Sequence, residues 1–316
     1  MSNREGSTTI VGRWIRGLRA SALSLAIGAN GMALGAEPAA QTAPEAVKDV
    51  GTSRTELRPL FNGKNLDGWY LFLQKYGRDS DPEKVVTIDD GILHAYKDAR
   101  NGAEVVMGYI GTRESYSDYQ FQLHYRWGKK QFKPRYLYKP DAGIYYHHVA
   151  KDVVWPQAMQ FQLELNGVGD LMTVGAIKLD TTVDPATKTE EWQEYLAPER
   201  GGVPYETTGK GVSYTRKGEN FERDGWNRLD LICKGDSALQ MVNGHVVSRG
   251  TKIRQQDPND PNRWIPLTGG RILIEFEASE ISYRDIGIRK LAPDETLEAA
   301  AVRASASAKT GATDGH

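Results

Sequence analysis

The chain has 316 residues, of which 39% are hydrophobic and 26% charged, which is enough for one domain with a sizeable core. Its 40 basic and 41 acidic residues nearly cancel, so we expect neither nucleic acid nor an anionic membrane as a partner. The single cysteine, Cys233, excludes an intrachain disulfide, and no CxxC motif or Cys/His cluster offers a soft-metal site.

The first 36 residues have the order of a secretory signal peptide. Basic residues come first, and an apolar run of small residues follows from 20 to 36. A transmembrane anchor is the alternative, but the run is short and is interrupted by Asn30. We therefore expect a periplasmic or secreted protein without stable membrane insertion.

The composition of the rest of the chain predicts where the folded domain begins and ends. Residues 37–54 are rich in Ala, Pro and Gln and are predicted to be a linker. Residues 55–291 carry the pattern of a single folded domain. Residues 292–316 are rich in Ala, Ser, Thr and Gly without apolar periodicity, so we predict a disordered tail.

Within the folded domain the dominant hydrophobic period is two, which is typical of half-buried strands. Segments 119–127 and 159–165 each have an apolar side and a hydrogen-bonding side. The polar sides hold Gln120, Gln122, His124 and Arg126 in the first segment and Gln160, Gln162 and Glu164 in the second. Asn243-Gly244 predicts a hairpin turn. Many short strands and almost no helical periodicity predict an all-β sandwich of two antiparallel sheets.

These polar rows have a composition that favours sugar binding over a merely solvated outer face, which is the plain alternative. They hold amides, imidazole, guanidinium and one carboxylate, with Tyr145 and Trp155 nearby in sequence. Such polar groups pair with vicinal hydroxyls, while aromatic rings pack on the C–H faces of sugars. The basic, aromatic loop 128–141 is also typical of nucleic-acid binding, but the neutral net charge argues against that function.

The segment Gly143–His148 places two histidines on opposite faces of a predicted strand. His147 shares a face with Gly143 and Tyr145, which makes it a candidate base, with a hydrogen-bonded structural role as the alternative. His148 is assigned to packing. Neither an HExxH motif nor an EF-hand loop is present, so we expect no cofactor and assign no metal ligand, while a divalent-metal requirement stays open.

The segment Leu60–Trp69 reads LFNGKNLDGW and resembles the opening signature of the 3-keto-disaccharide hydrolase family. Further similar segments follow in the family's order, at Asp141–His147, Val154–Gln162 and 270–286. The resemblance extends from about 57 to 291, the whole of the predicted folded domain.

The resemblance implies a concanavalin A-like jelly roll whose concave sheet holds the site, and activity on glycosides already oxidised at C3. A ketone at C3 acidifies the C2 hydrogen, so a base can remove it, the enolate can expel the C1 substituent, and water can then add. An upstream glycoside 3-oxidoreductase is the implied partner that supplies the ketone.

Four positions depart from the family's pattern, and two of them form a reciprocal exchange of glutamate and glutamine. Gln160 stands where the family has glutamate, and Glu275 stands where it has glutamine. The family's asparagine and serine before Gly143 are Asp141 and Ala142 here. Position 160 has therefore lost a carboxylate and position 275 has gained one. Either the two strands have exchanged these groups, or the protein has lost activity.

On this basis His147 or Glu164 is the expected base and Arg126 the clamp for enolate or substrate. The remaining expected substrate-binding residues are Gln160, Gln162, Tyr145, Trp155, His124 and Glu275. A non-catalytic carbohydrate-binding module is the alternative, favoured by Gln160. A retaining β-glucanase would need two carboxylates about 5 Å apart, and residues 164–169 do not match the E-x-D-x-x-E strand of such enzymes.

Overall fold

Alternating apolar residues give each strand one face that must be covered, and the computed structural model shows these faces packed together. It describes residues 56–187 and 193–310, which belong to one compact unit. The predicted signal peptide 1–36 and linker 37–54 lie outside the described residues.

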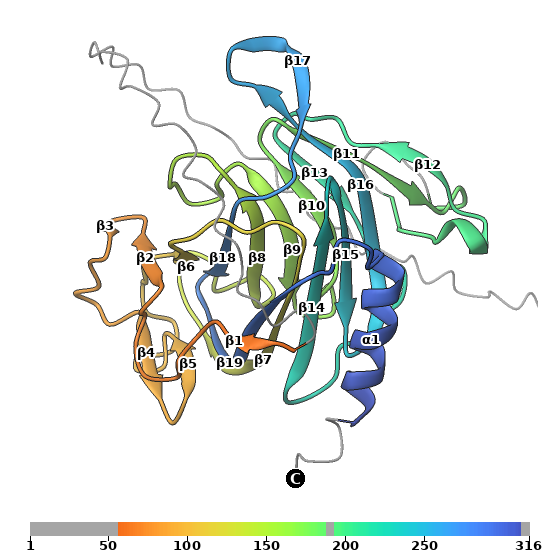
Figure 1. Ribbon diagram of the computed structural model, residues 1–316. Helices are drawn as coiled ribbons and strands as arrows, with labels where there is room; N and C mark the ends of the chain where they lie inside the picture. The colour runs from red at the N-terminus through yellow and green to blue at the C-terminus, as the bar shows by residue number, and fades with distance from the viewer. Residues whose placement is uncertain (1–55, 188–192, 311–316) are drawn as a thin grey trace, which may run out of the picture. The chain divides into compact units, whose positions relative to one another are not determined.

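The described strands form two sheets in which every strand pair is antiparallel (Figure 1). The eleven-stranded sheet contains β1 (Arg58–Pro59), β4 (Val86–Asp89), β5 (Ile92–Ala95), β7 (Tyr119–Gln131), β11 (Ile177–Val183), β12 (Val203–Glu206), β14 (Asn227–Lys234), β15 (Ser237–Val242), β16 (His245–Asp257), β17 (Asp260–Pro266) and β19 (Ser279–Lys290). The eight-stranded sheet contains β2 (Trp69–Leu73), β3 (Gly77–Arg78), β6 (Gly108–Thr112), β8 (Asp141–His148), β9 (Ala158–Glu164), β10 (Leu171–Val174), β13 (Val212–Thr215) and β18 (Arg271–Phe276).

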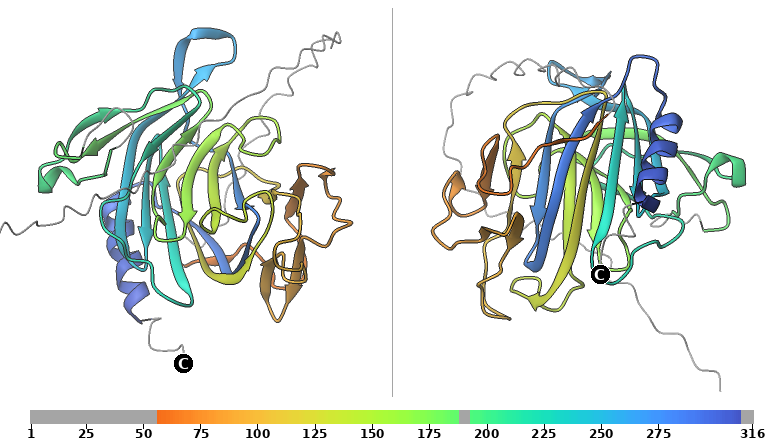
Figure 2. Two further views of the ribbon diagram at one scale, coloured as in Figure 1. Left: turned by 180° about the vertical axis from the view of Figure 1, so that it is seen from behind. Right: turned by 60° about the horizontal axis from the view of Figure 1, so that its bottom comes forward.

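The hydrophobic core lies between the two sheets. Leu123 and Leu231 from the eleven-stranded sheet belong to the same buried cluster as Ile144, Phe161 and Ile274 from the eight-stranded sheet. The strand order of the eight-stranded sheet is β13-β10-β9-β8-β18-β6-β2-β3, so β8, β9 and β18 lie at its centre. Figure 2 shows β8 and β9 side by side in the view from behind. The predicted two-sheet all-β sandwich is confirmed.

The predicted hairpin at Asn243-Gly244 joins β15 to β16. Asn243 has φ of 50° and Gly244 has φ of 82°, the positive values that a tight two-residue turn requires. A side chain at position 244 would also collide with Ala308, because its Cβ would lie 2.9 Å from the Ala308 Cβ. The glycine therefore serves both the turn and the approach of the C-terminal segment.

The predicted disordered tail is wrong for residues 297–310, which form helix α1 (Leu297–Thr310) against β14 and β15 (Figure 1). Thr296 caps its start by accepting a hydrogen bond from the Ala299 N–H at 3.1 Å. Ala300, Ala301 and Ala304 are buried in a cluster with residues of β14 and β15. Alanine has high helix propensity but a weak hydrophobic signal, so this apolar face was missed. This helix is neither long nor apolar enough to cross a membrane.

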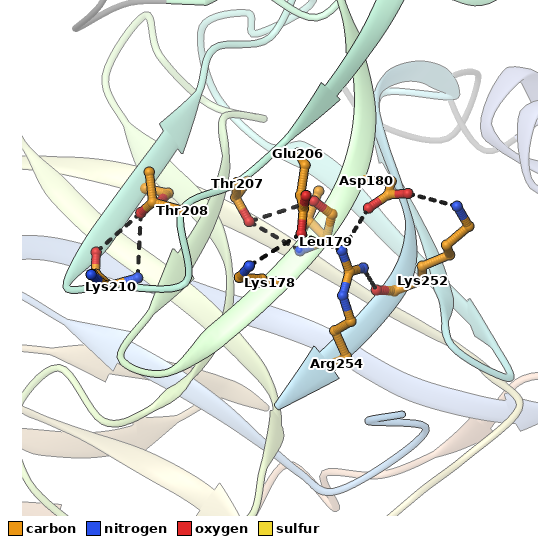
Figure 3. Close-up of polar contacts among 10 residues, drawn as sticks. Lys178, Leu179, Asp180, Glu206, Thr207, Thr208, Lys210, Lys252 and Arg254 are labelled. Carbon is orange, nitrogen blue, oxygen red and sulfur yellow. Dashed lines mark hydrogen bonds and ion pairs between the residues drawn. The ribbon is translucent and has the colours of Figure 1, made fainter. Parts of the chain in front are cut away.

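A corner of ion pairs joins β11, β12 and β16 (Figure 3). Arg254 bonds to both Asp180 and Glu206, at 2.9 and 2.6 Å, and Lys252 bonds to Asp180 at 2.8 Å. Lys178 lies 3.3 Å from Glu206 and also lies over the ring of Trp264, so its ammonium is already engaged. These contacts are partly exposed, so each stabilises the fold by about 1 kcal/mol or less.

Candidate active site

A polar patch lies on the outward face of β9, β8 and β18, at the centre of the eight-stranded sheet. The strand register decides which side chains meet there, because alternate residues share a face. Gly143 lies opposite both Gln162 and Glu275. Gln160 lies opposite Tyr145, one outward position further along the strands.

One chain of hydrogen bonds links these side chains. The Tyr145 hydroxyl donates to Glu275 Oε1 at 3.5 Å. Gln160 Nε2 donates to Glu275 Oε2 at 3.3 Å and to Gln162 Oε1 at 2.7 Å. Gln162 Nε2 donates to Asp141 Oδ1 at 2.8 Å. None of these five residues is more than 4% exposed, so their hydrogen bonds hold them in one arrangement.

Arg135 continues this chain at the Asp141 end. Its guanidinium donates to Asp141 Oδ2 at 2.6 Å and lies 3.1 Å from Glu277 Oε1. The indole of Trp155 lies near Glu277 and lowers the pKa of that carboxyl group. Two carboxyl groups, those of Asp141 and Glu277, therefore pair with one guanidinium, and the charge of Arg135 also lowers the pKa of Glu275.

Burial raises the pKa of Asp141 and of Glu275 well above the usual range of a carboxyl group, and the charge of Glu277 adds to both shifts. Burial also raises the pKa of Glu277, while Arg135 opposes that shift. The three carboxyl groups therefore titrate as a coupled group, in which burial favours the protonated forms. Environments that separate carboxyl pKa values are what acid–base chemistry requires.

Two of the positions that depart from the family pattern, Gln160 and Glu275, are in direct contact across β8. The pattern calls for glutamate on β9 and glutamine on β18, and this protein has the reverse. One carboxyl and one amide therefore meet at the same place in either arrangement. This geometry favours exchange between strands over loss of the site.

Gly143 makes that contact possible because it has no side chain between the two groups. A Cβ at position 143 would lie 2.4 Å from Gln160 Nε2 and 2.9 Å from Glu275 Oε2. We expect Gly143→Ala to separate the pair and to lower stability by about 1–3 kcal/mol, the usual cost of overpacking. Urea denaturation of the two proteins measures this difference, and an unchanged midpoint would show that the pair tolerates a methyl group.

Several residues predicted for the site do lie in or beside this patch. Gln160, Gln162, Tyr145 and Glu275 form the patch, and Trp155 lies at its rim, 37% exposed. Glu164 lies at the end of β9 opposite Asp141 and pairs with Lys139 at 2.8 Å. Its carboxylate is therefore at the solvent side of the patch.

Arg126 and His124 do not join this patch, because both residues lie on β7 in the other sheet. Arg126 is exposed and lies over the ring of Trp226 at 4.8 Å. His124 pairs with Asp285 on β19 at 3.2 Å. Their side chains alternate with those of Leu123 and Tyr125, which face the core, so they face away from the eight-stranded sheet.

The prediction that His147 shares the face of Gly143 and Tyr145 is wrong. His147 has φ of 55°, which breaks the alternation of β8 and places its ring in the core beside Tyr119 and Tyr146. It is fully buried, and neither ring nitrogen has a hydrogen-bond partner among the described residues. Burial lowers the pKa of His147 to about 4, so it is a neutral core residue.

A buried neutral histidine makes a protein sensitive to acid. The folded pKa of about 4 lies below the unfolded value, so stability is complete above about pH 6.5 and falls as the pH drops toward 4. Asparagine tolerates a positive φ and does not titrate in this range, so His147→Asn is the informative variant. Between pH 7 and pH 4.5 we expect its free energy of unfolding to fall by about 2 kcal/mol less than that of wild type. Urea denaturation at both pH values measures this difference, and equal losses would contradict the buried neutral state.

Arg135, Asp141 and Glu277 were not among the predicted site residues. Arg135 was one of several cations in the loop 128–141. Glu277 follows Glu275 at the two-residue period of a strand, and that spacing was the available signal. Within residues 56–187 and 193–310, no group of three or more His, Cys, Asp or Glu side chains is arranged to hold a metal ion.

Comparison with known proteins gives both a family match and structural likenesses. Residues 56–289 match the model of the 3-keto-alpha-glucoside-1,2-lyase-like domain. No curated protein matches the chain. A candidate glycosyl hydrolase from Parabacteroides distasonis is 18% identical, with a TM-score of 0.43 over 75% of this chain and 100% of that chain.

Two other solved structures are less similar in sequence. The carbohydrate-binding module CBM66 from Bacillus subtilis is 6% identical, with a TM-score of 0.38 over 71% of this chain and 96% of that one. A non-specific endo-β-1,3(4)-glucanase is 10% identical, with a TM-score of 0.39 over 78% of this chain and 93% of that one. At these scores the structural likenesses carry no weight for function. By the match over residues 56–289, the chain belongs to the family of 3-keto-alpha-glucoside-1,2-lyase-like domains.

Proposed function

We propose that this protein cleaves the C1–oxygen bond of 3-keto-glycosides by elimination, followed by addition of water. The observation that carries the proposal is the cluster of Asp141, Glu275 and Glu277 around Arg135, on the outward face of the central strands. Membership of the family supports a carbohydrate as the substrate.

The carboxyl groups divide the acid and base roles. Glu277 is paired with Arg135, which favours its carboxylate form, and the nearby indole of Trp155 acts in the same direction. Glu275 instead accepts hydrogen bonds from Tyr145 and Gln160, and burial raises its pKa, which favours its protonated form. The two are successive outward residues, with Cα atoms about 7 Å apart, which leaves room for a sugar carbon and its leaving oxygen.

In the elimination step, Glu277 takes the C2 proton and the electron pair forms the enolate. Arg135 balances the charge that develops on the C3 oxygen. The C1–oxygen bond then breaks, and the leaving oxygen takes the proton of Glu275. In the hydration step, Glu275 accepts a proton from the water that adds to C1, and Glu277 returns its proton to C2. Both carboxyl groups thus regain their starting states.

Other side chains of the patch bind and orient in this scheme. Asp141 holds the guanidinium of Arg135 from the other side and is itself fixed by Gln162. The amides of Gln160 and Gln162 are suited to sugar hydroxyls, and Trp155 can pack on a C–H face.

The test is incubation of the purified protein with a 3-keto-disaccharide and with its unoxidised parent, each with and without a chelator. We expect release of 3-keto-glucose from the keto compound alone. Chelation separates metal-dependent from metal-independent turnover. Binding of the plain disaccharide without turnover of either compound would instead indicate a non-catalytic carbohydrate-binding module.

A further inference from the structure

The loop 149–157, between β8 and β9, is fixed to the eight-stranded sheet beside the polar patch. Asp152 Oδ1 accepts hydrogen bonds from the hydroxyls of Tyr70 and Tyr109, at 2.8 and 2.7 Å, and Tyr109 lies opposite Glu275 in the sheet. Asp152 Oδ2 accepts a hydrogen bond from Arg78 Nε at 2.5 Å, and His148 Nε2 lies 3.6 Å from Oδ1. The tyrosines lie on β2 and β6, so this contact reaches across the sheet.

Trp155 lies three residues further along the loop. Its indole lies near Glu277 and lowers the pKa of that carboxyl group. Val154 packs against the main core cluster. The loop therefore approaches the polar patch at Trp155, beyond its attachment at Asp152.

The groups of the patch next to this loop have almost no access to solvent. Tyr145, Gln160 and Glu275 are 0%, 3% and 2% exposed. A sugar can touch Glu275 only after a neighbouring segment moves. The outer side of the loop exposes Val149 and Val153, so its attachment relies on polar contacts more than on apolar burial, which is typical of segments that open locally.

We propose that residues 149–157 form a cover that opens to admit the substrate, and that Asp152 is the positioning residue that closes it and returns Trp155 to Glu277. The part of this inference that concerns turnover rests on the proposed function. Burial by itself raises the pKa of Asp152, but the nearby His148 and the hydrogen bonds from Arg78 and the two tyrosines outweigh it and hold the pKa below the usual range. Asp152 is therefore charged whenever the cover is closed near neutral pH.

Hydrogen exchange of the full chain, resolved by mass spectrometry, tests the cover without any substrate. We expect Asp152→Asn to raise the exchange rate of residues 149–157 by about tenfold or more while the strands of the sandwich exchange as in wild type. Asp89→Asn is the matched control, because it removes the same charge from an exposed pair with Lys97 and should leave the loop unchanged. Tyr109→Phe removes one hydrogen bond to Asp152 and keeps the ring, so it should give a smaller change in the same loop.

Turnover provides the second readout. With a 3-keto-disaccharide, Asp152→Asn should lower kcat while KM changes less, because a loose cover no longer returns Trp155 to the base. If hydrogen exchange rises equally in all parts of the Asp152→Asn variant, Asp152 is merely a structural residue and the inference is overturned. If wild type cleaves no 3-keto-glycoside but hydrogen exchange of the variant rises only in residues 149–157, the cover stands and the proposed function fails.

Discussion

Glu277→Gln is expected to lower kcat on a 3-keto-disaccharide by about 10²–10⁴-fold, the range for loss of a general base. The substitution keeps the size and shape of the side chain. Arg135 keeps its partner Asp141, so substrate binding and KM should change little. Steady-state kinetics of the variant and wild type measure both constants.

Exchange of the C2 hydrogen with deuterium from D2O identifies the base directly. Wild type should exchange this hydrogen in a 3-keto-glycoside with a poor leaving group, and Glu277→Gln should not. Glu206→Gln is the control, because it removes a glutamate from an exposed corner remote from the patch and should behave as wild type. Undiminished exchange in Glu277→Gln would assign the base to another residue.

Glu275→Gln is expected to raise stability and to abolish turnover together. Burial raises the pKa of Glu275, so the folded state holds a proton that the unfolded chain releases. The buried carboxyl group therefore does not lower the free energy of unfolding at low pH. It lowers this free energy increasingly as the pH rises above about 4.3, the pKa of glutamate in the unfolded chain. We expect Tm at pH 8 to rise by about 2 °C or more, the change that about 1 kcal/mol gives in a domain of this size, with no rise near pH 4.

The same variant lacks the proton for the leaving oxygen. Turnover should fall by about 10²–10⁴-fold, while C2 exchange continues because Glu277 is intact. The pair of readouts thus separates the acid from the base. A lower Tm at pH 8 would show that Glu275 is ionised in the folded state.

The contact between positions 160 and 275 gives a further check on Glu275. Adding Gln160→Glu to Glu275→Gln places the carboxyl back at the same meeting point above Gly143. We expect the double variant to recover most of the lost turnover, whereas Gln160→Glu alone brings two carboxyl groups together and should lower stability above neutral pH. No recovery would show that the strand that carries the carboxyl matters.

Which polar row forms the patch could not be predicted from local pattern. The rows on 119–127 and 159–165 have the same alternation and similar residues, and both are outward rows of strands. Only strand order places β9 beside β8 and puts β7 in the other sheet. That order depends on pairing between distant segments, which alternation within one strand does not encode.

His147 shows a second limit, at the level of a single residue. Strict alternation places its ring on the outward face, but a positive φ at His147 itself turns it into the core. A positive φ is uncommon for residues other than glycine, and nothing in the neighbouring residues signals it. Helix α1 shows a third limit, since its buried alanines gain their partners only from β14 and β15.

The sequence by itself determined the two-residue period of the strands, the hairpin at Asn243-Gly244, the family, and the outward row of Gln160 and Gln162, because these depend on nearby residues or on direct similarity. The tertiary structure alone decided that Arg135, Asp141 and Glu277 lie beside Glu275, and that Asp152 of loop 149–157 bonds to Tyr70 and Tyr109 across the sheet. The physical reason is that hydrogen bonds across a sheet join residues far apart in the chain, as between Gln160 and Glu275, which are 115 positions apart.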